Sequence, residues 1–221
     1  MKRLEIATLF DTKNTIASDI FKGKKYPYEI LPEIKDFIVK LSAMLDLEKF
    51  DNLGGGVFVA KSATVAKSAE ISGPCIIDEG AEVRHCAFIR GNAIVGKGAV
   101  VGNSTELKNV ILFDKVQVPH YNYVGDSVLG YKAHLGAGAI TSNVKSDKTN
   151  VSILLNDKRY NTNLRKFGAI LGDCVEVGCG TVLNPGTIVG KNTNIYPLSM
   201  VRGYVAQNSI YKSRGDIVRK N

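Results

Sequence analysis

Two basic side chains occupy places that small or acidic residues mostly fill elsewhere in this sequence. Aliphatic residues recur at nearly every sixth position and are usually followed by Ala, Ser, Gly or Asp, whereas Arg90 follows Ile89 and Lys108 follows Leu107. The two cations are 18 residues apart, which is one coil of a chain that winds three hexapeptides per turn. Stacked about 5 Å apart, they repel by roughly 3 kcal/mol at an effective dielectric near 20, unless an anion lies between them. The spacing predicts a phosphate site; the alternative is a pair of solvated side chains that splay apart.

A histidine lies close to the position of these cations. His120 belongs to the segment PHYNYVGD at 119–126. Imidazole is well suited to accept a proton near neutral pH, so His120 is the candidate general base. Val124 returns to the position of Leu107 one coil later, which places Tyr123 beside the cations. A lone histidine is more often structural, and its place next to a predicted anion site is what favours catalysis.

The segment LGAGAITSN at 135–143 combines small residues with an amide. Glycine and alanine leave backbone N–H groups open to the carbonyl oxygen of a ligand. Asn143 can donate to the same kind of oxygen. Because glycine-rich corners are common in short repeats, this segment supports a site only together with its neighbours.

The elements that must position these residues follow from the repeat. From Val59 to Val201 the aliphatic ladder has a period of six, which predicts an all-β fold, a parallel β-helix whose coils stack about 4.8 Å apart. Between Leu107 and Leu129 two steps shrink from six residues to five. Departures from a local rule tend to mark functional sites, so this irregularity points to the same part of the chain.

The ends of the chain and one internal segment depart from the period. Residues 1–53 have apolar positions at helical spacing over 31–50 and are expected to form a small N-terminal helical cap over the open first coil. The β-helix is expected over 54–205, with a polar loop projecting at 143–167. Residues 206–221 are expected to form a C-terminal cap or hairpin.

Composition narrows the class of protein. The 221 residues carry a net charge of +8, which suits an anionic small molecule, and aromatic residues do not interleave with basic ones as in nucleic-acid binders. No apolar run approaches the roughly 20 residues of a membrane span. The N-terminus lacks a signal-peptide pattern, so a cytoplasmic protein without a membrane partner is expected. The four cysteines match no zinc or redox spacing, and no bound metal is expected.

Several strings, taken in order, resemble one family over residues 88–143. It is the acetyltransferase half of bifunctional N-acetylglucosamine-1-phosphate uridylyltransferase/glucosamine-1-phosphate acetyltransferase, together with its archaeal sugar-1-phosphate nucleotidylyltransferase relatives. The matching strings are Arg90-Gly91, VGNSTELK at 101–108, HYNYVGD at 120–126 and GAGAITSN at 136–143. The resemblance implies a left-handed β-helix, a homotrimer, and active sites between neighbouring subunits. It also implies that Arg90, Lys108 and Tyr123 bind a sugar phosphate.

The same resemblance implies the chemistry. His120 would take a proton from the amine of an amino-sugar phosphate such as glucosamine-1-phosphate, and Asn143 and Ala137 would face acetyl-CoA, the co-substrate. The amine would attack the thioester, and a tetrahedral oxyanion would collapse to release CoA. His134 stands where the family usually has a sugar-contacting Asn, and Cys179 where it has a small hydroxyl residue that helps to hold the cofactor. We therefore expect an N-acetyltransferase, and the sequence does not identify its acceptor sugar.

Other interpretations of the sequence remain open. The family's phosphate-binding loop lysine could be Lys145 or Lys148, and no nucleotide-binding loop precedes residue 54, so the nucleotidyltransferase half is expected to be absent. One alternative is a non-catalytic sugar-phosphate or sugar-nucleotide binding protein. Another is a zinc enzyme like the γ-class carbonic anhydrases, but His85 and His120 stand two coils apart, about 10 Å, and zinc–nitrogen bonds of about 2.1 Å cannot span that within one subunit.

Overall fold

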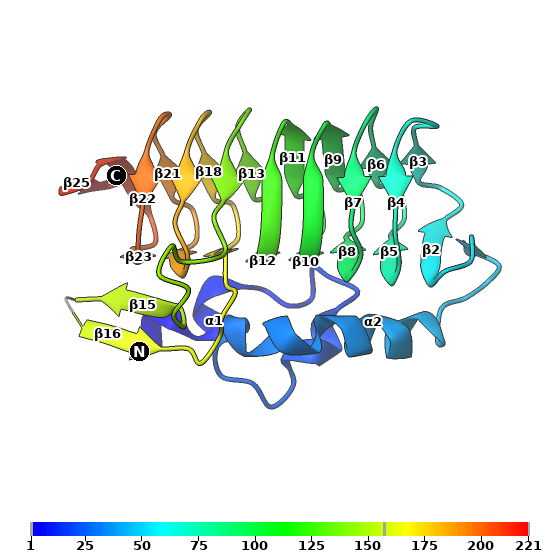
Figure 1. The fold of residues 1–221 in the computed structure, drawn as a ribbon, viewed down its shortest axis with the longest axis horizontal. Coiled ribbons are helices and arrows are strands. Elements are labelled where there is room, and N and C mark those ends of the chain that lie inside the picture. Colours follow the sequence, from blue (N-terminus) through cyan, green and yellow to red (C-terminus); the bar gives the residue numbers. More distant parts are fainter. Residues whose placement is uncertain (1, 157, 221) are drawn as a thin grey trace.

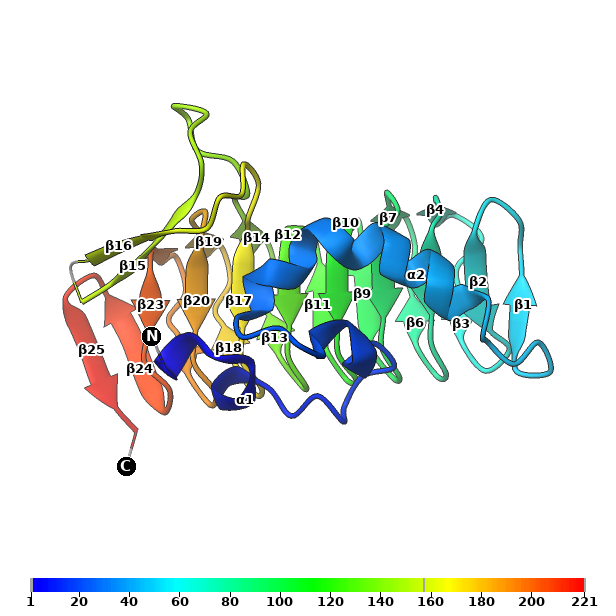
Figure 2. The same cartoon turned by 90° about the horizontal axis from the view of Figure 1, so that it is seen from below.

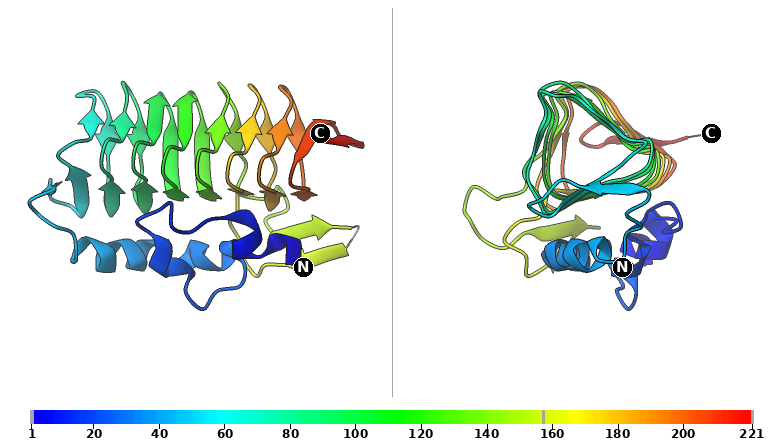
Figure 3. Two further views of the ribbon diagram at one scale, coloured as in Figure 1. Left: turned by 180° about the vertical axis from the view of Figure 1, so that it is seen from behind. Right: turned by 90° about the vertical axis from the view of Figure 1, so that its right-hand side faces the viewer.

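The recurring aliphatic residues turn inward and form the core of a three-sided prism, which Figure 3 shows in cross-section. The computed structural model describes residues 2–156 and 158–220. Its architecture is the predicted left-handed parallel β-helix, with about nine coils. Corner aliphatics such as Ile77, Ile89 and Leu107 are fully buried. Each coil adds one short strand to each side of the prism (Figure 1).

We number the three faces in the order in which the chain meets them. The first face contains β2 (Val57–Ala60), β5 (Cys75–Ile77), β8 (Ala93–Val95), the second halves of β10 (Glu106–Leu112) and β12 (Tyr123–Leu129), β17 (Ala169–Leu171), β20 (Thr187–Val189) and β23 (Tyr204–Val205). The second face contains β3 (Thr64–Val65), β6 (Glu82–Val83), β9 (Val100–Asn103), β11 (Gln117–His120), β13 (His134–Leu135), β18 (Glu176–Val177), β21 (Asn194–Ile195) and β24 (Ser209–Ser213). The third face contains β4 (Glu70–Ile71), β7 (Phe88–Ile89), the first halves of β10 and β12, β14 (Ile140–Thr141), β19 (Val182–Leu183) and β22 (Met200–Val201).

The strand register confirms the predicted stacking. Ile89 pairs with Leu107, so Arg90 and Lys108 lie one coil apart at the same corner. Leu107 then pairs with Val124, so the next coil has only 17 residues. Both shortened steps of the ladder fall where β10 and β12 run through the corner between the third and first faces.

The N-terminal segment lies along the first face, not over the first coil as expected from the sequence (Figures 1 and 2). It contains η1 (Lys2–Leu4), α1 (Ile6–Leu9), η2 (Ser18–Phe21), η3 (Pro27–Glu33) and α2 (Ile34–Ser42). The expected helix over 31–50 is therefore shorter, and its start is a 3₁₀ helix that contains Pro32. Among the helices of residues 2–156 and 158–220, none has the length and apolar character that crossing a membrane requires.

The first face attracts this segment because it is apolar on both sides. Successive side chains of a strand point to opposite faces, so the middle residue of each three-residue strand points away from the prism core. These middle positions form one stacked column of fully buried residues: Ile76, Ile94, Ile111, Val128, Ile170 and Ile188. From the other side, α2 contacts β5, β8 and β10, and its Ile34 and Ile38 are fully buried.

A strand, not a helix, pairs with the open edge of the first coil. After α2 the chain turns and forms β1 (Phe50–Asn52), which is antiparallel to β2. Phe50 lies opposite Ala60, and its side chain is buried. An unpaired strand edge invites association with other chains, and this short antiparallel strand covers that edge.

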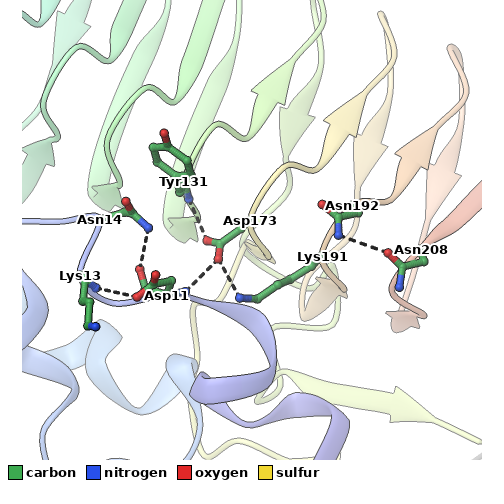
Figure 4. A network of polar contacts seen from close by, with 8 residues as sticks. All are labelled: Asp11, Lys13, Asn14, Tyr131, Asp173, Lys191, Asn192 and Asn208. Carbon is green, nitrogen blue, oxygen red and sulfur yellow. Dashed lines mark hydrogen bonds and ion pairs between the residues drawn. The ribbon is translucent and has the colours of Figure 1, made fainter.

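A buried carboxylate ties the N-terminal segment to the later coils (Figure 4). Asp173 Oδ2 accepts the backbone N–H of Asp11 at 2.8 Å and lies 2.8 Å from Lys191 Nζ. Its Oδ1 accepts the backbone N–H of Tyr131 at 3.0 Å, and its own N–H donates to Leu9 O at 3.0 Å. Because one side chain satisfies donors from both parts, it fixes where α1 ends against the prism.

Two hairpins complete the fold. The segment after Asn143 leaves the prism, and its hairpin of β15 (Ser152–Leu155) and β16 (Lys158–Asn161) lies back against the first face near β23. Val151 and Ile153 are fully buried there. At the C-terminal end, β24 pairs with β25 (Asp216–Arg219) in an antiparallel hairpin.

Neighbouring residues of α2 test this packing. Ile38→Ala removes a fully buried side chain and should lower the free energy of unfolding by about 2–5 kcal/mol. Val39→Ala, at a position that is 55% exposed, should change it by less than about 0.5 kcal/mol. Urea unfolding followed by circular dichroism measures both. Equal effects would contradict the burial of α2 against the first face.

Candidate active site

Two lysines meet at the corner between the third and first faces. We call this the cation corner; it is formed by Arg90, Lys108, Gly125 and Ser142 on successive coils. Burial, and next the ammonium group of Lys166 beside it, lower the pKa of Lys108. The two ammonium groups carry like charges at short range, so an anion placed between them would be stabilised by both.

Arg90 differs from the lysines because it already has an acidic partner. Its Nη1 lies 2.7 Å from Glu106 Oε1, and this hydrogen bond raises the pKa of Arg90. The guanidinium carbon also lies 5.9 Å from the ring centroid of Phe88. The repulsion expected between Arg90 and Lys108 is therefore partly offset by the Glu106 carboxylate. The ammonium group close to Lys108 is that of Lys166.

Tyr123 and Asn143 fill the gap that Gly125 leaves in this corner. A Cβ atom on Gly125 would lie 2.6 Å from the Tyr123 hydroxyl oxygen and 2.9 Å from the Asn143 amide nitrogen. That nitrogen donates to the Tyr123 hydroxyl at 3.3 Å and to Asp126 Oδ2 at 2.5 Å. Burial and the Asp126 carboxylate raise the pKa of Tyr123, so its hydroxyl keeps a proton that it can donate to an anion.

Asp126 itself is nearly fully buried, with 6% of its surface exposed. Its Oδ1 accepts the side-chain amide of Asn109 at 3.0 Å, and Asn109 also donates to the backbone oxygen of Leu31 in η3 at 3.1 Å. Both carboxylate oxygens are therefore bonded, and they hold Asn109 and Asn143 on either side.

The position of Lys166 follows from how the long loop leaves and rejoins the prism. Phe167 N donates to Asn143 O at 2.9 Å, so the chain re-enters the corner almost where it left. Lys166 directly precedes this closure. The two lysines favoured from the sequence lie elsewhere: Lys145 bonds to Asp147, and Lys148 is exposed in the loop.

His120 lies at a different corner, between the second and third faces. We call this the histidine corner; Asn103, His120, Ala137 and Cys179 occupy it on successive coils. His120 is exposed, and its ring makes no hydrogen bond within residues 2–156 and 158–220. The backbone N–H groups of Ala137 and Cys179 are likewise unbonded within that described part, so they can donate to a ligand oxygen.

Buried Asn122 shapes the histidine corner. Its amide donates to Gly136 O at 2.8 Å and to Ala139 O at 2.9 Å, and its oxygen accepts His120 N–H at 3.1 Å. One side chain therefore links two successive coils beside the candidate base.

His134 is not part of either corner. It lies on the second face, where its Nδ1 is 2.9 Å from Glu176 Oε2. The structure thus brings Arg90, Lys108, Tyr123 and Asn143 together at one edge of the third face, and His120, Ala137 and Cys179 at the other. Within the described ranges, no group of three or more His, Cys, Asp or Glu side chains could hold a metal ion.

Sequence reasoning missed three charged groups of the cation corner. Glu106 and Asp126 lie inside the matching strings and could have been found as the polar neighbours of Arg90 and Asn143 in adjacent coils. Lys166 gives no such signal, because the long loop after Asn143 lacks the six-residue period, so counting along the repeat does not place it.

Apolar side chains and cations also surround a groove beside the cation corner. A cavity of about 340 Å³ runs between the long loop and the last coils, lined among others by Ser142, Lys145, Arg159 and Arg202. A second cavity of about 360 Å³ shares Arg159 and Arg202 with it and adds Arg214. The ion pairs found in the described part of the chain include none of these three arginines.

The three-sided prism of hexapeptide coils is that of the left-handed parallel β-helix proteins. Residues 71–208 match the family model described as the GMPPB C-terminal domain, and the chain belongs to this family. The resemblance to the acetyltransferase half of the bifunctional sugar-phosphate enzymes is confirmed by its relatives.

Two curated relatives illustrate the extent of the match. The chain is 31% identical to the bifunctional protein GlmU of Methanococcus maripaludis over 195 residues, covering 87% of this chain and 47% of that protein. It is 33% identical to the bifunctional sugar-1-phosphate nucleotidylyltransferase/acetyltransferase of Sulfurisphaera tokodaii over 189 residues, covering 76% and 46%. The chain thus spans about half the length of the curated relatives it matches.

Solved structures give a weaker likeness. The acetyltransferase domain of PglB from Neisseria gonorrhoeae, in complex with acetyl coenzyme A, matches 81% of this chain and 62% of its own. Its sequence identity is 14% and its TM-score 0.28.

The lowered pKa of Lys108 predicts a pH dependence of anion binding. The charged form binds the anion, so affinity is present below the folded pKa and is lost as the pH rises through it, earlier than for an ordinary lysine. Sulfate keeps its charge throughout, and its affinity should fall about tenfold between about pH 7 and about pH 10, the loss of one charge-assisted bond. Isothermal titration calorimetry measures this.

The matched control is Lys108→Arg. A guanidinium is not deprotonated in this range, so the variant should lose most of the decline. An equally steep decline in the variant would show that Lys108 is not the group that titrates.

Proposed function

We propose that the protein is an acyl-CoA-dependent N-acetyltransferase whose acceptor is an amino-sugar phosphate such as glucosamine-1-phosphate. The observation that carries the proposal is the pair of close ammonium groups, Lys108 and Lys166, beside the Tyr123 hydroxyl. Three donors at one corner suit a phosphate group, and the net charge of +8 favours its approach.

The chemistry assigns a role to each corner. The phosphate of the acceptor binds at the cation corner, and its amine lies near His120. The exposed imidazole accepts a proton from the amine as the nitrogen attacks the thioester carbon of acetyl-CoA. The oxyanion of the tetrahedral intermediate accepts hydrogen bonds from a free backbone N–H, for which Ala137 is the candidate. The C–S bond then breaks, and the protonated imidazole returns its proton to the CoA thiolate.

The groove beside the cation corner supports acetyl-CoA as the co-substrate. It begins at Ser142, next to Asn143, and continues to Arg202, two coils further on. Its apolar lining residues, Val144, Leu154 and Pro185, suit the pantetheine chain. Arg159, Arg202 and Arg214 suit the phosphates of the nucleotide. Among the neighbours in structure, PglB from Neisseria gonorrhoeae was solved with acetyl coenzyme A.

We further propose a homotrimer with active sites between subunits. In one chain the third face separates His120 from Lys108, so a complete site forms readily when the histidine corner of one subunit faces the cation corner of the next. Exposed apolar side chains near the histidine corner support such an interface: Tyr121 is 67% exposed, Leu198 86% and Met200 58%.

His120→Ala tests the proposed base. We expect kcat to fall by about 10²–10⁴-fold while acetyl-CoA still binds, because general base catalysis contributes about that much. His85→Ala is the matched control, since His85 occupies the same corner two coils away and should leave transfer unchanged. A thiol-release assay with acetyl-CoA and a panel of amino-sugar phosphates measures this. Unchanged turnover in His120→Ala would remove it as the base.

The wild-type protein in the same assay separates catalysis from binding alone. Release of CoA with at least one acceptor supports the transferase. Binding of ligands without release from any acceptor would instead identify a non-catalytic binding protein of the same fold.

Mixed trimers test whether the site is shared. We expect His120→Ala and Lys108→Ala to be inactive alone. In a co-expressed one-to-one mixture, each site draws both residues from intact subunits with a probability of one half times one half, so about a quarter of the wild-type activity should return. Mixed trimers as inactive as their parents would place both residues in one subunit's site.

A further inference from the structure

The Asp126 carboxylate fixes the orientation of the Asn143 amide. Asn143 Nδ2 lies 2.5 Å from Asp126 Oδ2 and 3.3 Å from the Tyr123 hydroxyl. A carboxylate oxygen only accepts, so the nitrogen of the amide must face Asp126. The two amide hydrogens are then directed to these two oxygens, and Asn143 Oδ1 makes no hydrogen bond within residues 2–156 and 158–220.

Asp126 is in turn held from the N-terminal segment. Asn109 Nδ2 bridges Asp126 Oδ1 at 3.0 Å and the backbone oxygen of Leu31 at 3.1 Å. Leu31 belongs to η3 and is buried in the hydrophobic core, so packing holds this end of the bridge in place.

An aromatic contact reaches the other side of Asn143. Tyr28 of η3 stacks on Phe167, with ring centroids 5.8 Å apart, and Phe167 N donates to Asn143 O. The same short helix thus contacts the residue that closes the long loop and, through Asn109, the carboxylate that holds the amide.

We propose that Asp126 is a positioning residue that turns the oxygen of Asn143 toward the ligand. Asn143 then accepts a hydrogen bond from a ligand N–H, rather than donating to a carbonyl oxygen as the sequence suggested. Helix η3 maintains this arrangement through Asn109. The inference rests on the proposed function, because the ligand N–H is that of the amine or of the pantetheine amide.

Exchanging the two residues tests the orientation. Asp126→Asn and Asn143→Asp each leave a mismatched pair, so each should lower the melting temperature by roughly 3–10 °C and kcat/KM by at least about tenfold. In the double variant, the amide introduced at position 126 can donate to the carboxylate introduced at position 143 and still accept from Asn109. We expect its melting temperature to recover and its kcat/KM to return to within about tenfold of the wild type, because position 143 again offers an acceptor.

The double variant separates the possible roles of position 143. If it regains stability but not activity, the side chain at this position acts as a donor. If it regains neither, the two side chains do not form the bond. If the wild type itself transfers no acetyl group, the proposed function fails and the ligand-facing role with it, whereas the recovery of melting temperature still decides the Asp126–Asn143 bond.

A second variant tests the link to η3. Asn109→Ala removes the bridge to Leu31 and should lower kcat by at least about tenfold, with the KM for acetyl-CoA changed less than about threefold. Asn192→Ala is the matched control, because both asparagines have positive φ, 53° and 56°. Within residues 2–156 and 158–220 the side chain of Asn192 hydrogen-bonds only to Asn208 at the surface (Figure 4). Equal kcat values for the two variants would overturn the role of Asn109.

Discussion

The stacking of one buried aliphatic column on another is the constraint on which the rest depends. Because each corner aliphatic must stay inside the prism, a coil cannot gain or lose a residue within a strand without turning its apolar side chains outward. The length change at the cation corner is therefore absorbed in the turn. Three residues lie between Ile89 and Ala93, but only two between Leu107 and Val110. The short turns place Asn109 and Asp126 in the left-handed conformation, with φ of 53° and 49°, which these residue types adopt more readily than most.

The two shortened turns explain why the side chains of the site lie close together. Asn109 and Asp126 follow Lys108 and Gly125 on consecutive coils, so their side chains meet one coil apart and bond to each other. The same register leaves Gly125 without a side chain beneath the Tyr123 hydroxyl. The aliphatic ladder is shortened by two five-residue steps that are visible in the sequence, and this shortening brings the polar side chains of Asn109, Asp126 and Tyr123 together.

The sequence predicts this part of the site well because the repeat converts residue number into height along the prism. The register of Ile89 on Leu107 and the place of Tyr123 beside Lys108 both follow from counting. Counting fails where the chain leaves the prism. Lys166 reaches Lys108 only because Phe167 bonds back to Asn143, and nothing in the loop sequence fixes that closure.

The position of the N-terminal segment shows that apolar burial, more than backbone pairing at the open edge, decides where this segment packs. An open first coil offers a few unpaired backbone groups, and the short strand β1 suffices to pair with those of β2. The first face offers six stacked aliphatic residues, and burying them is worth roughly 9–18 kcal/mol as an upper estimate. This burial outweighs the pairing of one short edge and places η3 and α2 along the prism. The three-residue apolar runs of β5, β8 and β17 are the signal in the sequence that predicts it. Helix η3, which packs along the prism, thereby also supports Asn109 through Leu31. One interface therefore sets both the packing of the N-terminal segment and the orientation of the site side chains.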